Sequence, residues 1–287
     1  MENTDDLEFR KLDFEGLKTL IKWAEDEGWN PGEYDAEVFW TTDPDGFYGY
    51  FHKGEMIGGG SVVVYDPMFG FMGFFIVKPA YRARGIGQML WYHRRDILLS
   101  RLNKEASIGM DGVLAMQPFY RKGGFEIAFR DERHEKIGMV FHVDHNISAI
   151  AEQDTDAILA FDLKCFGFPR PAFMKPWLKL PAVKTFKYVL SGTLKGFAVV
   201  RKVKKGYKVC PLFADNAEVA EELYKACLNS VAGEPLYIDI PVVNSAAIAM
   251  VRKYNTNYVF ECARMYFGRT PQMDINKVFG ITTFELG

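Results

Sequence analysis

The sequence predicts a protein of two α+β domains, each a mixed, mostly antiparallel sheet flanked by helices. Three observations support this fold class. Strand-like segments at residues 47–52, 56–65 and 69–77 are joined by connections short enough for antiparallel hairpins. A strand, a helix and a strand then follow between residues 69 and 114, which is the order of a parallel crossover unit. The second half of the chain repeats the order of elements found in residues 47–130.

Composition and charge limit the class of protein. Hydrophobic residues make up 48% of the 287, which is enough for a large core. No apolar run approaches the roughly 20 residues of a membrane-spanning helix, and the acidic start of the chain is unlike a signal or transit peptide. The 4 cysteines are scattered, which suits a reducing compartment, and the net charge of −2 argues against a nucleic-acid partner. We therefore expect a cytoplasmic protein that binds neither membranes nor nucleic acid.

Capping residues and the spacing of apolar residues define the elements of the first half. Asp13 can cap the first helix, whose apolar side chains recur at helical spacing. A longer helix is expected over residues 85–102, with an apolar stripe that includes Met89, Leu90 and His93, so His93 is interpreted as a packing residue. The other expected elements are strands 7–11, 108–114, 125–130 and 136–142 and helices 34–40 and 117–122.

The second half repeats this order after a boundary near residues 144–147. A capping-box pattern at Asp215 and Glu218 opens one helix, and Asn244 opens another. The economical interpretation is two copies of one unit, a first domain of residues 1–145 and a second of residues 146–287. The expected elements are helices 154–166, 215–233 and 244–253 and strands 186–190, 196–203, 207–213, 235–240 and 258–267.

The strongest local signal lies between residues 75 and 88. A strand ends there in a basic turn that contains Gly85 and Gly87, and a helix begins. A helix start presents free backbone N–H groups and the positive end of the helix dipole, so the segment predicts a site for phosphate or pyrophosphate. It is not a Walker A loop, because no Lys-Ser/Thr pair follows the glycines. It is not a dinucleotide fingerprint either, because Leu90 stands where a third glycine would be.

This turn resembles the R-x-x-G-x-G acyl-CoA signature of the GNAT superfamily of N-acyltransferases, as Arg82-x-x-Gly85-x-Gly87. The resemblance covers most of residues 7–142 and implies acetyl-CoA as the co-substrate, with no metal. The residues that it implies for acetyl-CoA binding are Phe75, Ile76, Val77, Arg82, Ala83, Arg84, Gly85, Ile86, Gly87 and Gln88.

A second segment is similar to the FY-x-x-x-GF segment of the same superfamily, here Phe119-Tyr120 before Gly124-Phe125. The resemblance implies that Tyr120 protonates the thiolate of coenzyme A as it leaves. Strands 69–77 and 108–114 should separate at their carboxyl ends and leave a slot for the pantetheine arm, with a backbone N–H near Val77 at the oxyanion.

The whole chain is similar to GNAT proteins with a second GNAT-like domain, of the kind named after the holothin acyltransferase. Pro211-Leu212-x-Ala214-Asp215 is one of the segments that carry this likeness. The second copy has no R-x-x-G-x-G, and Val251 stands opposite Tyr120. We expect it to be degenerate and to bind no coenzyme A in the same way.

The reaction expected from the resemblance is transfer of an acetyl group to a small primary amine by direct attack. The alternatives are a protein or peptide acceptor and a non-catalytic acyl-CoA sensor. Candidate acceptor-side residues are Glu27, Trp29, Asn30 and Asp111. The base that deprotonates the amine is left open among Asp111, Glu27 and Asp35, and Asp111 can equally be a structural carboxylate. A homodimer is one assembly that the sequence allows.

Charge is distributed unevenly along the chain. Residues 1–45 hold 14 acidic and 4 basic residues, a net charge of −10, whereas residues 146–287 carry a net charge of +5. The acidic segment can steer a cationic acceptor toward the site, or it can dock the basic second half. His142 and His145 lie on opposite faces of an extended segment, so they are interpreted as solvated residues and no metal is expected.

Overall fold

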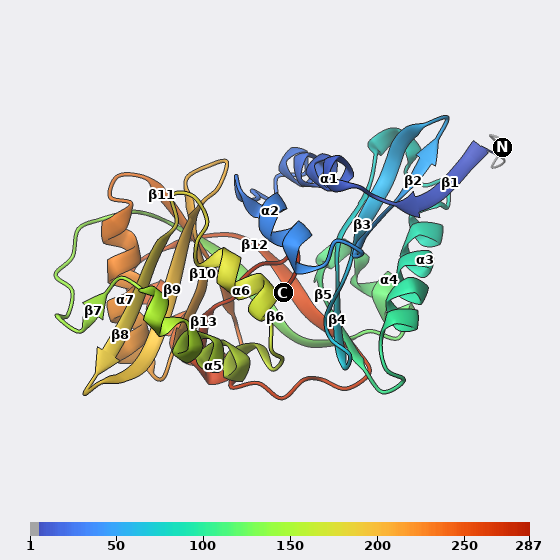
Figure 1. Ribbon diagram of the computed structural model, residues 1–287. Coiled ribbons are helices and arrows are strands. Elements are labelled where there is room, and N and C mark those ends of the chain that lie inside the picture. Colours follow the sequence, from blue (N-terminus) through green and yellow to red (C-terminus); the bar gives the residue numbers. More distant parts are fainter. Residues whose placement is uncertain (1–5) are drawn as a thin grey trace.

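The computed structural model describes residues 6–287. The prediction that the chain does not start with a signal or transit peptide was drawn mostly from residues 1–5, which lie outside this range. Two halves lie side by side, and one sheet runs through both of them (Figure 1). The strand order in this sheet is β1-β2-β3-β4-β5-β12-β6-β11-β10-β9-β8-β7, with β13 beside β10.

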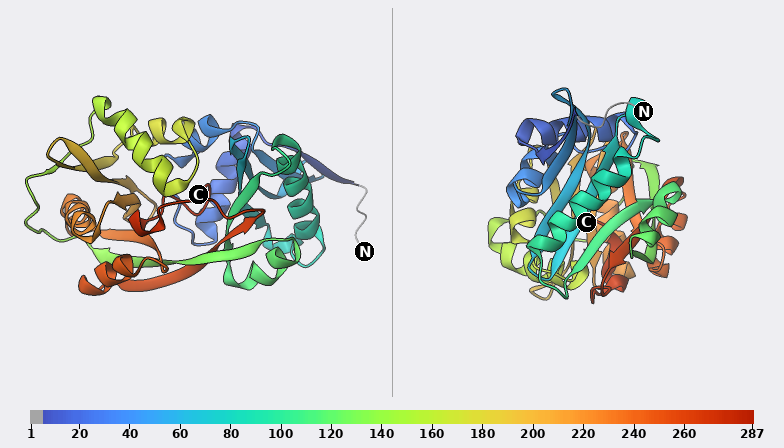
Figure 2. Two further views of the ribbon diagram at one scale, coloured as in Figure 1. Left: turned by 90° about the horizontal axis from the view of Figure 1, so that it is seen from below. Right: turned by 90° about the vertical axis from the view of Figure 1, so that its right-hand side faces the viewer.

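The first half matches the expected order of elements. α1 begins after Asp13, whose carboxylate accepts a hydrogen bond from the backbone N–H of Gly16 at 2.8 Å. Figures 1 and 2 show α3 on the outer face of the first-half strands and α1 and α2 on the face toward the second half. The strands are β1 (Leu7–Lys11), β2 (Phe47–His52), β3 (Glu55–Asp66), β4 (Phe69–Val77), β5 (Ser107–Val113) and β6 (Glu126–Ile137). The helices are α1 (Phe14–Asp26), α2 (Asp35–Thr42), α3 (Ile86–Arg101) and α4 (Gln117–Lys122).

The crossover unit is confirmed. β4 pairs with β3 in antiparallel fashion and with β5 in parallel fashion. The parallel pairing joins only Phe69–Met72 to Ser107–Met110, and within residues 6–287 no strand pairs with the carboxyl end of β4 on that side. The two strands therefore separate where the sequence predicts a slot.

The second half contains the elements expected from the sequence together with elements that periodicity did not show. α6 is one of these, a short helix that begins at Pro171 and carries a second proline at Pro176. The helices are α5 (Thr155–Phe166), α6 (Pro171–Trp177), α7 (Ala217–Ser230) and α8 (Ser245–Lys253). The strands are β7 (Ile147–Ser148), β8 (Lys184–Leu190), β9 (Thr193–Lys202), β10 (Tyr207–Ala214), β11 (Pro235–Pro241), β12 (Asn257–Phe267) and β13 (Val278–Gly280).

The two halves exchange strands, which the sequence analysis did not foresee. β12 inserts between β5 and β6, with Cys262–Phe267 opposite Ile108–Val113. β6, in return, pairs with β11 of the second half. The backbone hydrogen bonds of each half thus continue into the other, and the second half supplies residues to the edge of the predicted slot.

Three local predictions need correction. The buried face of α3 runs through Leu90 and Arg94, whereas Met89 and His93 are exposed. The strand expected at residues 125–130 continues to Ile137 as β6, because β11 and β12 pair with it through its charged middle. Most of the strand expected at residues 136–142 is absent, since residues 139–142 form no strand. The cap of α7 is Asn216, which accepts from the N–H of Val219 at 2.9 Å, and not Asp215.

Apolar packing joins the halves along α2 and α6. The ring of Phe39 stacks on that of Trp177, with centroids 6.3 Å apart, and both side chains are fully buried. Beside this stack, the Asp35 carboxylate accepts from Nη1 of Arg201 at 2.6 and 2.7 Å. Across residues 6–287, every helix is too short or too polar to span a bilayer.

Candidate active site

The loop between β4 and α3 leaves a helix N-terminus without a side-chain cap. Ala83 and Gly85 both have a left-handed backbone, with φ of 60° and 83°. Alternating backbone handedness turns successive N–H groups toward one concave side, as in anion-binding nests. None of the side chains in residues 6–287 caps α3 at Gly85. The loop and the first turn of α3 therefore keep N–H donors available for an anion.

The arginines of this loop are held by local contacts. Nε of Arg82 donates to the carbonyl oxygen of Val77 at 2.8 Å, and its guanidinium pairs with Glu27. The Arg84 guanidinium carbon lies 5.7 Å from the ring centre of Tyr81. Both charges stay beside the N-terminus of α3, where they add to the attraction for an anion.

A cavity of about 600 Å³ begins at this loop and follows the gap between β4 and β5. Its far wall comes from the exchanged strand β12 and from Phe284 and Glu285, so both halves build it. The predicted residues that line it are Glu27, Trp29, Phe75, Ile76, Val77, Arg82, Ala83, Gly87, Asp111 and Tyr120. The predicted residues outside its lining are Asn30, Arg84, Gly85, Ile86 and Gln88.

A bulge in β4 marks the point where the strand leaves β5. Phe74 has a φ of 48°, in the left-handed region, and the register with β3 shifts between Gly59 and Ser61. A non-glycine residue in this conformation costs roughly 1–3 kcal/mol, and the surrounding packing holds it in place. The bend directs residues 75–77 along the cavity. The backbone N–H and C=O groups of these residues that face β5 are not paired with that strand.

Tyr120 lies on α4 at the inner end of the cavity. The residue is 4% exposed, and its ring centre lies 6.3 Å from that of Phe75 and 6.4 Å from that of Trp91. Its hydroxyl makes no hydrogen bond to any described residue. Burial raises the pKa of Tyr120, with a small opposing effect from nearby Arg94. The phenol therefore stays protonated and can donate a proton to a group in the cavity.

Arg94 is a site residue that the sequence analysis missed. It lies on the buried face of α3, lines the cavity, and is 1% exposed. One N–H group donates to the carbonyl oxygen of Ser61 at 3.1 Å, while Nε and Nη1 have no partner among the described residues. Burial lowers the pKa of this guanidinium to about 10. Arg94 adds positive charge beside Tyr120, at a position outside the apolar stripe expected for this helix.

Three carboxylates line the cavity, and they differ in their partners. Glu27 pairs with Arg82, as described above. Asp111 on β5 accepts from Nε and Nη2 of Arg264 on β12 at 2.7 and 2.9 Å, and burial raises its pKa to about 6. Glu285 is the third, and the sequence analysis did not single it out. Strand exchange thus places Arg264 beside Asp111, and the two side chains form a bidentate ion pair. This contact agrees with the alternative given above, in which Asp111 is a structural carboxylate.

The other candidate acceptor-side residues have distinct positions. Trp29 lines the cavity, and its carbonyl oxygen accepts from Arg133 at 2.9 Å. Asn30 faces the second half, where its side chain accepts from the backbone N–H of Lys205 at 2.9 Å. Asp35, considered above as a base, is bound by Arg201 and lies outside the cavity lining. Asn30 and Asp35 therefore hold the two halves together.

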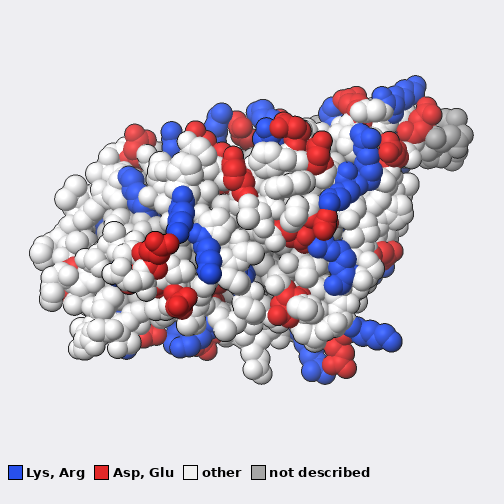
Figure 3. Space-filling model, viewed as in Figure 1, with Lys and Arg blue, Asp and Glu red and all other residues white. Residues whose placement is uncertain are grey.

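The acidic first segment is largely engaged in ion pairs. In Figure 3, acidic and basic groups alternate along the upper edge of the molecule, over α1. Among the acidic residues of the described range 6–45, Glu27 alone lines the cavity. These contacts support docking of the basic second half more directly than steering. The pairs that join the segment to the second half are Glu25–Lys204, Glu33–Lys202 and Asp35–Arg201.

The second copy lacks the corresponding features. Asn216 caps α7, so the end that would receive an anion is already satisfied by a side chain. Asp215 adds negative charge there and pairs with Lys195 and Lys277. In residues 6–287 no group of three or more His, Cys, Asp or Glu side chains could hold a metal ion, and the cysteines are buried and free.

Comparison with known proteins finds one GNAT match in each half of the chain. Residues 14–125 match the model of the acetyltransferase (GNAT) family, and residues 158–280 match the model of an acetyltransferase (GNAT) domain. Holothin acyltransferase from Pseudoalteromonas sp. (strain SANK 73390) is 30% identical over 275 residues, covering 95% of this chain and 92% of that protein.

Solved structures share the arrangement of both halves. A putative acetyltransferase from Pyrococcus horikoshii superposes with a TM-score of 0.84 at 21% identity, covering 100% of this chain and 99% of the other. A tandem GNAT protein from the clavulanic acid biosynthesis pathway superposes with a TM-score of 0.65 at 14% identity, covering 91% and 98%. The chain therefore belongs to the GNAT family of acyltransferases and carries two GNAT domains in tandem.

Proposed function

We propose that the protein transfers an acetyl group from acetyl-CoA to the primary amine of a small, cationic molecule. The observation that carries this proposal is the continuous cavity that leads from the uncapped start of α3, along the free edge of β4, to the buried hydroxyl of Tyr120. Acetyl-CoA supplies an activated acyl group whose thioester is open to an amine. We assign the binding of acetyl-CoA and the protonation of the departing sulfur to residues 1–145, whereas residues 146–287 complete the acceptor side of the cavity.

Different residues along the cavity have different roles in the proposed reaction. The N–H groups of the loop at 82–88, with Arg82 and Arg84, bind the phosphates. Residues 75–77 offer backbone hydrogen bonds to the pantetheine arm, as a peptide edge binds an added strand. A backbone N–H near Val77 stabilises the negative charge that develops on the carbonyl oxygen. Tyr120 gives its proton to the departing sulfur.

The closed acceptor side supports a small acceptor over a protein or peptide. Phe260 on β12 and Phe284 form part of the wall opposite β4, so the second half covers the space where an extended chain would lie. The carboxylates at this end support a cation. Because most acidic residues of the first segment are ion-paired, the salt dependence of kcat/KM should be modest and should come from the cavity carboxylates.

The test is an acceptor screen with acetyl-CoA. Primary amines are compared with matched alcohols and acids at low and high salt, and released thiol is measured. Amine-dependent release supports the proposal. Binding of acetyl-CoA without turnover of any acceptor would favour the sensor alternative, and turnover of peptides alone would favour the peptide acceptor.

The stoichiometry of acetyl-CoA binding, the oligomeric state and the cellular location each need their own measurement. Calorimetry should show one acetyl-CoA per chain, because the second copy has a capped helix and no basic glycine loop. Two equal sites would contradict this assignment. The proposed homodimer is tested by light scattering, and the proposed cytoplasmic location by fractionation of cells.

A further inference from the structure

Glu285 lies in a segment, residues 281–287, that is fixed at several points. The hydroxyl of Tyr65 donates to the carbonyl oxygen of Leu286 at 2.9 Å, and Nη1 of Arg170 donates to that of Gly287 at 2.9 Å. The Thr283 hydroxyl accepts from the backbone N–H groups of Glu285 and Leu286 at 3.0 and 2.9 Å. These contacts hold the segment next to β4 and keep Glu285 at the acceptor end of the cavity.

The Glu285 carboxylate has no partner. The residue is 2% exposed, and its side chain makes no hydrogen bond or ion pair with any residue in 6–287. Oε2 is fully buried in this state. A buried carboxylate without a cation or a hydrogen-bond donor is strongly unfavourable, so such a group points to a ligand that completes it.

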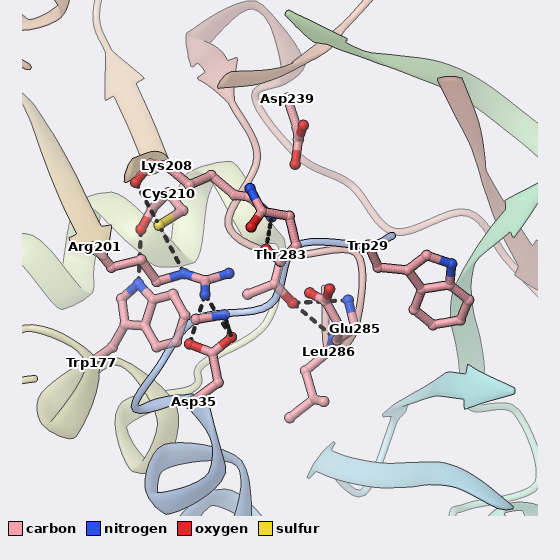
Figure 4. A network of polar contacts seen from close by, with 12 residues as sticks. Trp29, Asp35, Trp177, Arg201, Lys208, Cys210, Asp239, Thr283, Glu285 and Leu286 are labelled. Atoms are coloured by element: carbon pink, nitrogen blue, oxygen red, sulfur yellow. Dashed lines mark hydrogen bonds and ion pairs between the residues drawn. The ribbon is translucent and has the colours of Figure 1, made fainter. Parts of the chain in front are cut away.

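The cations around Glu285 make their ion pairs and hydrogen bonds with other groups, although Nη2 of Arg201 has no partner in the described chain. Figure 4 shows the Glu285 carboxylate between Trp29 and the Arg201–Asp35 pair. Lys208, also buried, donates to the carbonyl oxygen of Asn30 at 3.2 Å. Three buried arginines of this region each pair with an aspartate. The pairs are Arg201–Asp35, Arg133–Asp239 and Arg264–Asp111.

The two other carboxylates of the cavity are less available to bind a cationic ligand, because each already has an arginine partner. Both oxygens of Asp111 accept from Arg264, and Glu27 is bound by Arg82 at the opposite mouth. An ammonium group has N–H donors that match two carboxylate oxygens, and it would supply the hydrogen bonds that no described residue gives to Glu285. Glu285 is the unpartnered acceptor among the cavity carboxylates of the described chain.

We propose that Glu285 binds the ammonium group of the acceptor and takes one of its protons, an inference that rests on the proposed function. The neutral nitrogen then forms its bond to the acyl carbon while the carbon–sulfur bond breaks. The sulfur receives the proton of Tyr120, and the nitrogen loses a second proton as the amide forms. This second proton returns to Tyr120 through solvent, and Glu285 releases the first one, so that one proton is released in each turnover.

The test compares Glu285→Gln with wild type on two acceptors. One is an alkylamine, which is protonated at neutral pH, and the other is 2,2,2-trifluoroethylamine, which is mostly neutral there. With the alkylamine, kcat/KM should fall by about 10²-fold or more, the size of a lost general base. With the neutral amine the loss should be severalfold only, because no proton has to be removed before attack.

The matched control is Glu261→Gln. Glu261 lies between Phe260 and Cys262 on β12 and pairs with Arg130 outside the cavity. This control should keep wild-type rates with both amines. Glu285→Asp, which keeps the charge, should recover part of the lost rate with the alkylamine.

Stability separates this role from a structural one. Because Glu285 has no partner to lose, Glu285→Gln should bind acetyl-CoA like wild type and unfold at the same or a higher temperature. Equal losses with both amines, or wild-type rates in Glu285→Gln, would overturn the assignment. If Glu285→Gln does not fold, the carboxylate is structural and the assignment also fails. Absence of amine-dependent thiol release in wild type would instead overturn the proposed function itself.

Discussion

Gly73 is the position on β4 against which the Glu285 segment is pressed, and Gly73→Ala tests that contact. A Cβ at this position would lie 1.8 Å from the Glu285 carbonyl oxygen and 2.8 Å from its carbonyl carbon. Such contacts do not occur in folded proteins, so the segment would have to withdraw by roughly 1 Å. The hydrogen bonds from Tyr65 and Arg170 oppose that movement.

The size of the effect follows from this geometry. Overpacking of a fixed segment costs about 1–3 kcal/mol, so the free energy of unfolding should fall by that amount in urea. A displacement of about 1 Å in a positioning group can cost roughly 10²-fold in rate, so kcat with an alkylamine should fall to a similar extent. The affinity for acetyl-CoA should stay near that of wild type, because the phosphate loop is not touched.

Gly87→Ala is the steric control for stability. Its Cβ would lie 3.6 Å from the ring of Phe75, an ordinary contact, and its position in the first turn of α3 favours alanine over glycine. This variant should unfold at the same denaturant concentration as wild type or higher. Wild-type stability and turnover in Gly73→Ala would show that the Glu285 segment is not held against β4, and would refute this reasoning.

Three further variants test separate parts of the site. Tyr120→Phe should lower kcat by about 10²-fold or more with little change in acetyl-CoA affinity, and unchanged kcat would assign the proton to another group. Gly87→Glu puts a carboxylate where phosphate should bind and should abolish acetyl-CoA binding in calorimetry; retained binding would move the phosphate site elsewhere. Burial lowers the pKa of Lys208 from 10.5 to about 8, with Arg133 adding to the effect. The unfolded chain then holds this proton more tightly between those pH values, so stability should rise with pH across that window by up to about 3 kcal/mol. Lys208→Met should lose that rise in urea unfolding at pH 8 and pH 10, and the same rise in both proteins would remove Lys208 as its cause.

Local chemistry made much of the site predictable. The phosphate loop is continuous in sequence, and its glycines and arginines mark a helix start directly. Tyr120 follows β5 by one short turn, so its place at the end of the slot depends only on the crossover unit. The separation of β4 from β5 follows from that same unit.

The rest depends on contacts between distant parts of the chain. β12 follows β5 by more than a hundred residues. The sequence patterns of the two strands do not indicate that they pair with each other. Strand exchange decides that Asp111 meets Arg264, and the contacts of Tyr65 and Arg170 with residues 286 and 287 place Glu285 at the cavity. Arg94 was missed because a charged residue marks the polar face of a helix in sequence, whereas here it is buried beside the cavity.

Acyl transfer to an amine in this cavity is tested most directly by following both products of one reaction. Wild-type protein is incubated with acetyl-CoA and an alkylamine, and free thiol and N-acetylated amine are measured together. The expected result is equal amounts of the two products, formed only when the amine is present and absent with Gly87→Glu. Thiol release that does not depend on the amine, or no release with any amine tried, would contradict acyl transfer to an amine.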